Sequence, residues 1–168
     1  MLGYVIAEER GAADRCLAEV VHRLHAEGVA VAGAVQVNSD RGPAQVCDMD
    51  LHVIGPGRII RISQNLGTLA KGCRLDPAGL EQAVGLVEAT LDAGARPRLL
   101  VVNKFGKQEI DGRGFRPVIG RALAEGIAVL TAVNIASLPG FRAFAGGMEE
   151  EVAPETGAIL DWCRRVAG

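Results

Sequence analysis

Residues 2–28 read LGYVIAEERGAADRCLAEVVHRLHAEG, and this stretch decides the fold. Its apolar beginning, 2–7, is typical of a short buried strand. After a polar turn, apolar residues recur at helical spacing from 12 to 26, and Gly28 ends the helix. A buried strand that turns directly into a helix is half of a βαβ unit, so the stretch predicts an α/β protein built on parallel strands.

The rest of the chain continues this alternation. Three further apolar runs predict buried strands at 29–37, 99–102 and 127–133. Helical spacing and end signals predict helices at 77–93, 115–125 and 154–166. Two β-like runs, 46–54 and 58–62, flank Gly55-Pro56-Gly57 and predict an antiparallel hairpin. We therefore expect a mainly parallel sheet with helices on both faces and a β-hairpin addition.

Composition limits the classes of function. The chain has 168 residues, which fits one domain over 1–168, and 49% hydrophobic residues suit a covered sheet. A net charge of −2 gives no reason to expect nucleic acid, and no apolar run is long enough for membrane insertion. No signal peptide is visible and no two cysteines have C-x-x-C spacing, which predicts free thiols and a cytoplasmic location. A homodimer is compatible with the sequence, although no pattern predicts one.

The turn after the first strand is the first candidate site. Ligands of open α/β sheets bind outside the carboxyl ends of the strands, and a helix that starts there offers free backbone N–H groups to an anion. Arg10 could add two hydrogen bonds to phosphate or another oxyanion, and Gly11 belongs to the same turn. Asn38 follows the second strand at the same edge. The alternative is an ordinary turn in which Glu8 and Glu9 favour the positive end of the helix.

The second candidate site follows the strand 99–102. Lys104 and Lys107 could neutralise anionic oxygens, with Asn103 beside them. The alternative is a solvated basic loop in which Asn103 caps a turn. Arg113 lies in a glycine-rich segment, 111–114, that could cover a ligand or could be a plain connection.

Two further groups of polar residues are weaker candidates. Gln64 and Arg74 lie in a segment without periodicity, where Cys73 beside a cation could have a lowered thiol pKa. No histidine lies near Cys73 in sequence, so a structural thiol is favoured over a catalytic one. Asp48, Asp50 and His52 alternate along a predicted strand and could face one metal ion. A half-exposed strand with an outward polar face explains this spacing more simply, and we predict no metal site.

Three motifs together resemble a known family: YVIAEERGAAD at 4–14, GTLAKGCRLDP at 67–77 and VVNKFGKQEIDGRGFRPVIGRALAEGIAVLTAV at 101–133. The chain resembles, over nearly its whole length, an uncharacterised bacterial family related to P-loop nucleoside-triphosphatases. The resemblance implies a P-loop-like three-layer α/β fold. Members of that family are often encoded near molybdate-transport genes, which implies a link to molybdate.

The resemblance also identifies what this chain has lost. A working Walker A loop, G-x-x-x-x-G-K-[ST], carries a lysine for the phosphates and a Ser/Thr for magnesium, but here only Gly11 remains of its glycines and both functional residues are absent. The related triphosphatases carry D-E-x-G-x-x-E after the equivalent strand, and 103–109 matches it at Gly106 and Glu109. Asn103 and Lys104 replace the two acids. Degenerate Walker A and Walker B sites together argue against nucleotide hydrolysis, because phosphoryl transfer depends on metal and positioned charge.

We therefore predict that the chain binds a small anionic ligand, such as a nucleotide, phosphate or a molybdate-like oxyanion, without efficient hydrolysis. The residues expected at the ligand are Arg10, Gly11, Asn38, Asn103, Lys104, Lys107 and Arg113. Secondary candidates are Gln64, Arg74 and Glu109.

Two alternatives stay open from the sequence. The first is an active nucleoside triphosphatase or kinase in which Asp14, Asp50 or Glu109 holds magnesium. The second is a protein-interaction or regulatory module. In that case the segment 138–144, which holds two of the four phenylalanines, would be a contact patch, although both rings could equally pack in the core.

Overall fold

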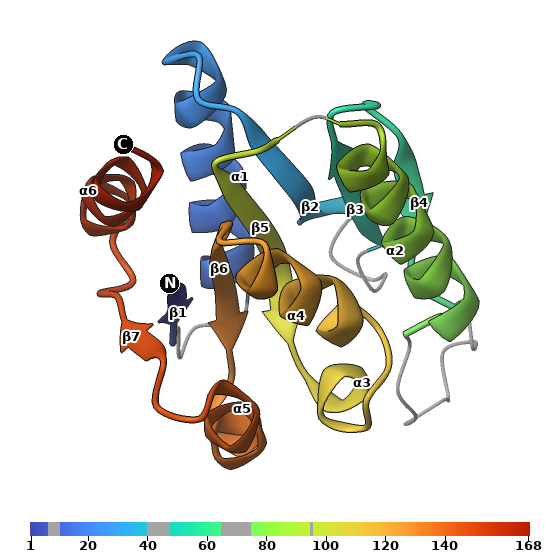
Figure 1. Cartoon of the computed structure of the whole chain (residues 1–168). Helices are drawn as coiled ribbons and strands as arrows, with labels where there is room; N and C mark the ends of the chain where they lie inside the picture. The colour runs from blue at the N-terminus through green and yellow to red at the C-terminus, as the bar shows by residue number, and fades with distance from the viewer. Residues whose placement is uncertain (7–10, 40–47, 65–74, 95) are drawn as a thin grey trace.

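A computed structural model describes residues 1–6, 11–39, 48–64, 75–94 and 96–168 (Figure 1). Its strands form one sheet of seven in the order β4-β3-β2-β5-β6-β1-β7. The strands are β1 (Leu2–Val5), β2 (Val31–Ser39), β3 (Asp48–Ile54), β4 (Ile59–Arg61), β5 (Leu99–Phe105), β6 (Ala128–Val133) and β7 (Glu149–Glu151). The helices are α1 (Ala12–Ala26), α2 (Pro77–Asp92), α3 (Lys107–Ile110), α4 (Arg116–Ala124), α5 (Leu138–Ala145) and α6 (Thr156–Ala167), with a 3-10 turn η1 (Ile135–Ser137).

The pairing of the strands confirms the predicted sheet. β1, β2, β5, β6 and β7 pair in parallel, whereas β3 and β4 add an antiparallel hairpin at one edge. Because parallel strands are joined by crossover helices, both faces of the sheet are covered. This three-layer α/β arrangement is that of a P-loop-like fold.

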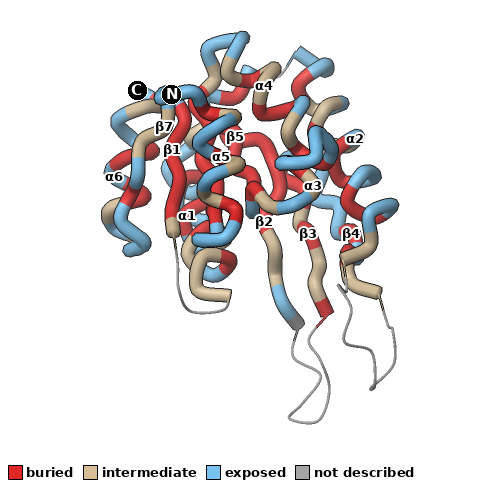
Figure 2. The backbone as a smooth tube through the Cα atoms, turned by 90° about the horizontal axis from the view of Figure 1, so that it is seen from below, coloured by how far each residue is buried: buried red, intermediate tan, exposed pale blue. Residues whose placement is uncertain are grey.

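Two apolar cores lie on the two faces of the sheet. On one face α1 and α6 pack on the sheet through side chains such as Leu17, Val20 and Ile159. On the other face α2, α4 and α5 contribute residues such as Val84 and Val118. Figure 2 shows the strands buried along much of their length between these layers.

The direction in which the chain winds changes beside β1. The helix that follows β1 covers one face of the sheet, whereas α5, which follows the neighbouring strand β6, belongs to the core of the other face. Where neighbouring strands send their connections to opposite faces, a crevice opens at their carboxyl ends, and ligands of such folds bind there. The beginning of α1 and the ends of β1, β5 and β6 therefore mark the place to look for a site.

Several predicted element ends are confirmed. The first helix covers Ala12–Ala26 as its apolar spacing predicted. α2 begins after Asp76, whose carboxylate accepts a hydrogen bond from Ala78 N at 3.0 Å, with Pro77 in the first turn. None of the described helices has the length and apolar character needed to cross a membrane.

Two expectations about the later chain were wrong. The polar loop predicted from Asn103 is instead the end of β5, which continues to Phe105 because that residue pairs with Val133 of β6 and is fully buried.

The sequence pattern did not predict α5 or β7. Phe141 of α5 is fully buried, with its ring 5.0 Å from that of Tyr4 and 5.2 Å from that of Phe105, so it is a core residue and not part of a contact patch. Phe144 is half-buried against Phe105.

Candidate functional site at the start of α1

Four polar side chains meet where β2 and β5 end and α1 begins. We call Asp14, Gln36, Asn38 and Asn103 the Asp14 tetrad. Asp14 belongs to the first turn of α1, Gln36 and Asn38 to the last part of β2, and Asn103 to the last part of β5. Asp14 and Asn103 are buried, with 5% and 4% of their surface exposed.

Side-chain amides surround the Asp14 carboxylate. Asn103 Nδ2 donates to Asp14 Oδ1 at 3.0 Å. Gln36 Nε2 and Asn38 Nδ2 donate to Asp14 Oδ2 at 3.3 and 3.2 Å. Every polar partner that the described residues give to this carboxylate is therefore a neutral amide. These donors satisfy the hydrogen-bonding capacity of both oxygens of the buried carboxylate.

A backbone contact fixes the orientation of the Asn103 side chain. Its Oδ1 accepts a hydrogen bond from Gln36 N at 2.8 Å. A backbone N–H can only donate, so the atom facing Gln36 N must be the amide oxygen. The amide nitrogen of Asn103 consequently faces Asp14.

The beginning of α1 lies beside the tetrad. Gly11 precedes the helix with φ +77°, a conformation that glycine adopts readily. It has no side chain to cap the first N–H groups of the helix, and no other described side chain caps them. A side chain at Gly11 would begin 3.4 Å from Arg15 Nη1 and 3.7 Å from Asn38 Nδ2, so a guanidinium and an amide lie next to this helix end. Backbone N–H groups, a cation and an amide donor together suit an anion.

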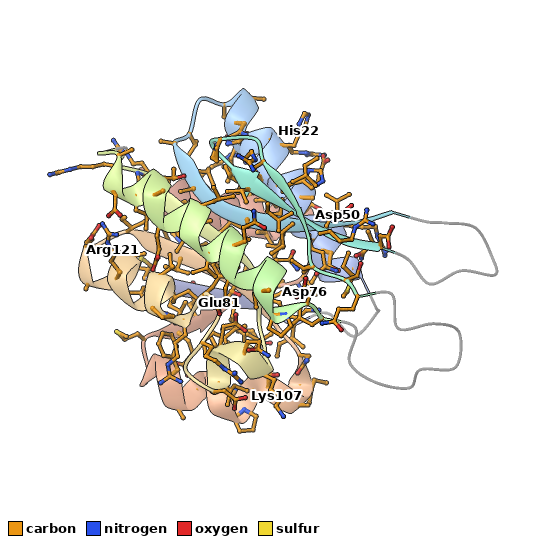
Figure 3. The ribbon with its side chains drawn as sticks, turned by 90° about the vertical axis from the view of Figure 1, so that its right-hand side faces the viewer. His22, Asp50, Asp76, Glu81, Lys107 and Arg121 are labelled. Carbon is orange, nitrogen blue, oxygen red and sulfur yellow. The ribbon has the colours of Figure 1, made fainter. Side chains whose placement is uncertain are left out.

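The structure brings only part of the predicted site together. Gly11, Asn38 and Asn103 lie at the start of α1 as described. Three further predicted cations, Lys104, Lys107 and Arg113, are exposed and have no hydrogen bond or ion pair with the tetrad within the described residues. Arg113 lies 3.5 Å from Asp111 and lines a pocket between α2 and α4. Figure 3 shows Lys107 on α3, well apart from Asp50 on the hairpin.

The remaining predicted residues lie elsewhere. Gln64 is half-buried and follows Ser63, which bridges to Leu75 beyond the end of β4. Arg10, Arg74 and Cys73 lie outside the described residues, as do Glu8 and Glu9.

Glu109 ties two helices together. Its Oε2 accepts from Gly106 N at 2.9 Å and its Oε1 accepts from Phe115 N at 3.0 Å, which joins the start of α3 to the start of α4. Glu81 of α2 accepts from Gly114 N at 3.0 Å in the same corner. Because both oxygens of Glu109 already bind backbone N–H groups, the structure gives this carboxylate a structural role.

Burial raises the pKa of Glu109, against the lowering effect of its backbone hydrogen bonds, and the nearby Glu81 charge raises it further. A carboxyl group whose pKa is raised by folding contributes stability that is fully present below its unfolded pKa of 4.5 and is lost as the pH rises through the folded value. We therefore expect the stability of the wild type, relative to Glu109→Gln, to fall between pH 4.5 and neutral pH. Urea unfolding of both proteins across this range measures the difference. A difference that stays constant or grows with pH would contradict this account.

The candidates for magnesium binding differ in their partners. Asp50 and Asp48 of the hairpin are bridged by Arg61, at 2.7 and 2.9 Å, which offsets part of the negative charge on the face that also carries His52. Within the described residues, no group of three histidine, cysteine, aspartate or glutamate side chains is placed to hold a metal ion. Of the three carboxylates named for the enzyme alternative, only Asp14 has neither a cationic partner nor a backbone N–H partner in the described part of the chain.

The sequence did not indicate Arg15, and it placed Gln36 in a candidate segment, 36–40, without singling it out. Gln36 and Asn38 are two residues apart on one strand, so they share a face, and this spacing could have indicated the pair. Arg15 directly follows the acid of the first helical turn, but only the structure shows that its guanidinium folds back toward Gly11.

Fold and site together define a P-loop-like α/β protein whose candidate site lies at the start of the first helix. A family model described as "Protein of unknown function (DUF2478)" matches residues 2–162, and the chain belongs to this family. It is also similar to the "Molybdenum import ATP-binding protein ModC 2" of Bradyrhizobium diazoefficiens, with 36% identity over 151 residues. That match covers 90% of this chain but 17% of the relative, so the chain spans less than a fifth of the relative's length. No solved structure matches the chain.

Proposed function

We propose that this protein binds a small anionic ligand at the start of α1 and does not hydrolyse it efficiently. The ligand is a nucleotide, phosphate or a tetrahedral oxyanion such as molybdate. The observation that carries the proposal is the start of α1, where no side chain of the described residues caps the first N–H groups and where Arg15 and Asn38 lie beside Gly11. This helix has 15 residues and starts at the edge of the sheet where ligands of such folds bind, so its positive end favours an anion there.

The residues around this helix end support binding without turnover. Ala12 and Ala13 follow Gly11, where a working phosphate loop has lysine and Ser/Thr. Asn103 stands where P-loop enzymes hold magnesium through an aspartate, and its amide nitrogen bonds to Asp14. Phosphoryl transfer depends on these charges to stabilise its transition state, so a site without them binds better than it catalyses.

The similarity to a longer ATP-binding protein of molybdenum import supports the ligand class. A segment like this chain forms part of a protein with that name, which makes a nucleotide and molybdate the first ligands to try. We place the domain in the cytoplasm as an accessory to molybdate metabolism. This role also agrees with the gene neighbourhood that the family resemblance implies.

Anions should stabilise the protein through Arg15. At a ligand concentration 100 times the Kd, one binding site adds about 2.7 kcal/mol to the free energy of unfolding. Thermal melts in EDTA with millimolar ATP, phosphate, sulfate or molybdate should therefore show a higher Tm for at least one of them. Arg15→Ala should abolish most of that increase. Arg23→Ala is the matched control, because Arg23 lies on the same helix but in its last turn, far from Gly11. No change of Tm with any of the four ligands would contradict the proposal.

The enzyme alternative has its own test. If the protein were an active triphosphatase or kinase, Asp14 would be the residue best placed to hold magnesium. We expect phosphate release from ATP to stay at background with and without magnesium. Magnesium-dependent release that is lost in Asp14→Asn would favour the enzyme instead.

A further inference from the structure

The acid of the Asp14 tetrad lies on a helix, whereas the corresponding acid of P-loop enzymes follows a strand. In P-loop enzymes the aspartate that holds magnesium follows a strand, and a hydroxyl at the start of the first helix completes the metal site. Here the strand β5 carries the amide Asn103, and the first turn of α1 carries the acid Asp14. Their side chains meet at 3.0 Å, and both are buried.

Asn103 cannot present its oxygen to this centre. Gln36 N holds that oxygen at 2.8 Å, so the amide nitrogen is the atom that faces Asp14. Nitrogen-bound hydrogens then point at the carboxylate from three sides, from Asn103, Gln36 and Asn38. These three hydrogen bonds use most of the roughly four lone-pair positions of the carboxylate, so a divalent cation would have to compete with amide donors for it.

We infer that Asn103 is the positioning residue that makes this site independent of divalent metal. The inference rests on the proposed function only for its consequence for the ligand, which is that the anion binds without magnesium. Metal binding by the tetrad can be measured without any anion. The inference about metal and the proposal about anion binding can therefore fail separately.

One substitution should reverse this property. Asn103→Asp would place a second carboxylate oxygen about 3 Å from Asp14, and two carboxylates so close either share a proton or require a cation. Two carboxylates with amide oxygens and water are ligands that suit Mg²⁺ and Mn²⁺. The variant should therefore be less stable in EDTA and should regain stability when metal is added.

The experiment compares thermal unfolding at neutral pH in EDTA, in MgCl₂ and in MnCl₂, without anionic ligand. We expect the wild-type Tm to be the same in all three, and the Tm of Asn103→Asp to rise by about 4 °C or more with metal, which corresponds to 1–2 kcal/mol for a chain of this size. Asn134→Asp is the matched control, because Asn134 follows the neighbouring strand β6 but lies exposed and outside the tetrad. It should show no response to metal.

A second variant keeps the inference testable if Asn103→Asp does not fold. Asp14→Asn with Asn103→Asp exchanges the acid and the amide, keeps a single carboxylate in the tetrad and should fold without metal. The inference is overturned if Asn103→Asp folds but ignores both metals. It is also overturned if Mg²⁺ or Mn²⁺ binds the wild type in calorimetric titration and Asp14→Asn abolishes that binding. If Asn103→Asp does not fold at all, wild-type titration without heat of binding, together with a folded exchange variant, supports the inference.

Discussion

Gly33→Ala should prevent this domain from folding at ordinary temperatures. Gly33 is the third residue of β2, where it pairs with Ile54 of β3 on one side and Val101 of β5 on the other. Its φ is +121°, which alanine adopts only at a cost of about 1–3 kcal/mol. A Cβ there would also overlap the carbonyl oxygen of Val101 and lie 2.8 Å from its carbonyl carbon. Only a shift of the backbone could relieve that overlap, and β2 joins the hairpin to the rest of the sheet.

The combined loss should exceed about 4 kcal/mol, which is a large part of the stability of an ordinary domain. Circular dichroism of the purified variant and urea unfolding measure it. Gly85→Ala is the matched control, since Gly85 lies in α2 with open space where a Cβ would be added. Alanine there should be neutral or should stabilise the helix by up to about 1 kcal/mol. A folded Gly33→Ala protein with a wild-type Tm would show that the path of β2 is not as described.

Asn103→Leu should cause the second largest loss of stability. Leucine keeps the branching and the number of heavy atoms of the side chain but is bulkier and has neither a donor nor an acceptor. Asp14 then loses one of its three amide donors, and Gln36 N loses its partner. Each buried polar group left without its partner costs about 1–3 kcal/mol, and two such groups are left here. Asn134→Ala is the comparison, because that asparagine accepts one hydrogen bond, from Ser137 N at 2.7 Å, at an exposed cap that should be worth about 1 kcal/mol.

A double-mutant cycle assigns the loss to the contact between the two side chains. Asp14→Asn, Asn103→Leu and the double variant should give a coupling energy in the range of about 0.5–3 kcal/mol that is typical of residues in one network. Urea unfolding of the four proteins measures it. If Asn103→Leu costs no more than Asn134→Ala, or the two substitutions are additive, the tetrad does not stabilise the buried carboxylate in the way described here.

Much of the fold could be predicted because its signals are local. Apolar spacing and Gly28 define α1, and the Gly-Pro-Gly turn defines the hairpin of β3 and β4. The continuation of β5 through Asn103 could not be predicted in this way. Two polar residues interrupt the apolar run, and the strand continues only because Phe105 finds Val133 and the ring of Phe141, which are distant in sequence.

The candidate site likewise combines residues whose place could be predicted from the sequence with contacts that could not. The rule for open α/β sheets correctly placed Gly11, Asn38 and Asn103 at one edge of the sheet. It could not show that the amide of Asn103 points at Asp14, because that depends on the register that brings Gln36 N of β2 to its oxygen. The place of Arg15 beside Gly11 likewise depends on a side-chain conformation that spacing does not determine.

Isothermal titration calorimetry of the wild-type protein in EDTA tests the central claim most directly. ATP, phosphate and molybdate are titrated separately, first at low salt and then with MgCl₂ in place of EDTA. The account predicts saturable binding of at least one of them, with one site per chain and the same Kd with and without magnesium. No saturable binding of any of the three, in either buffer, would contradict it.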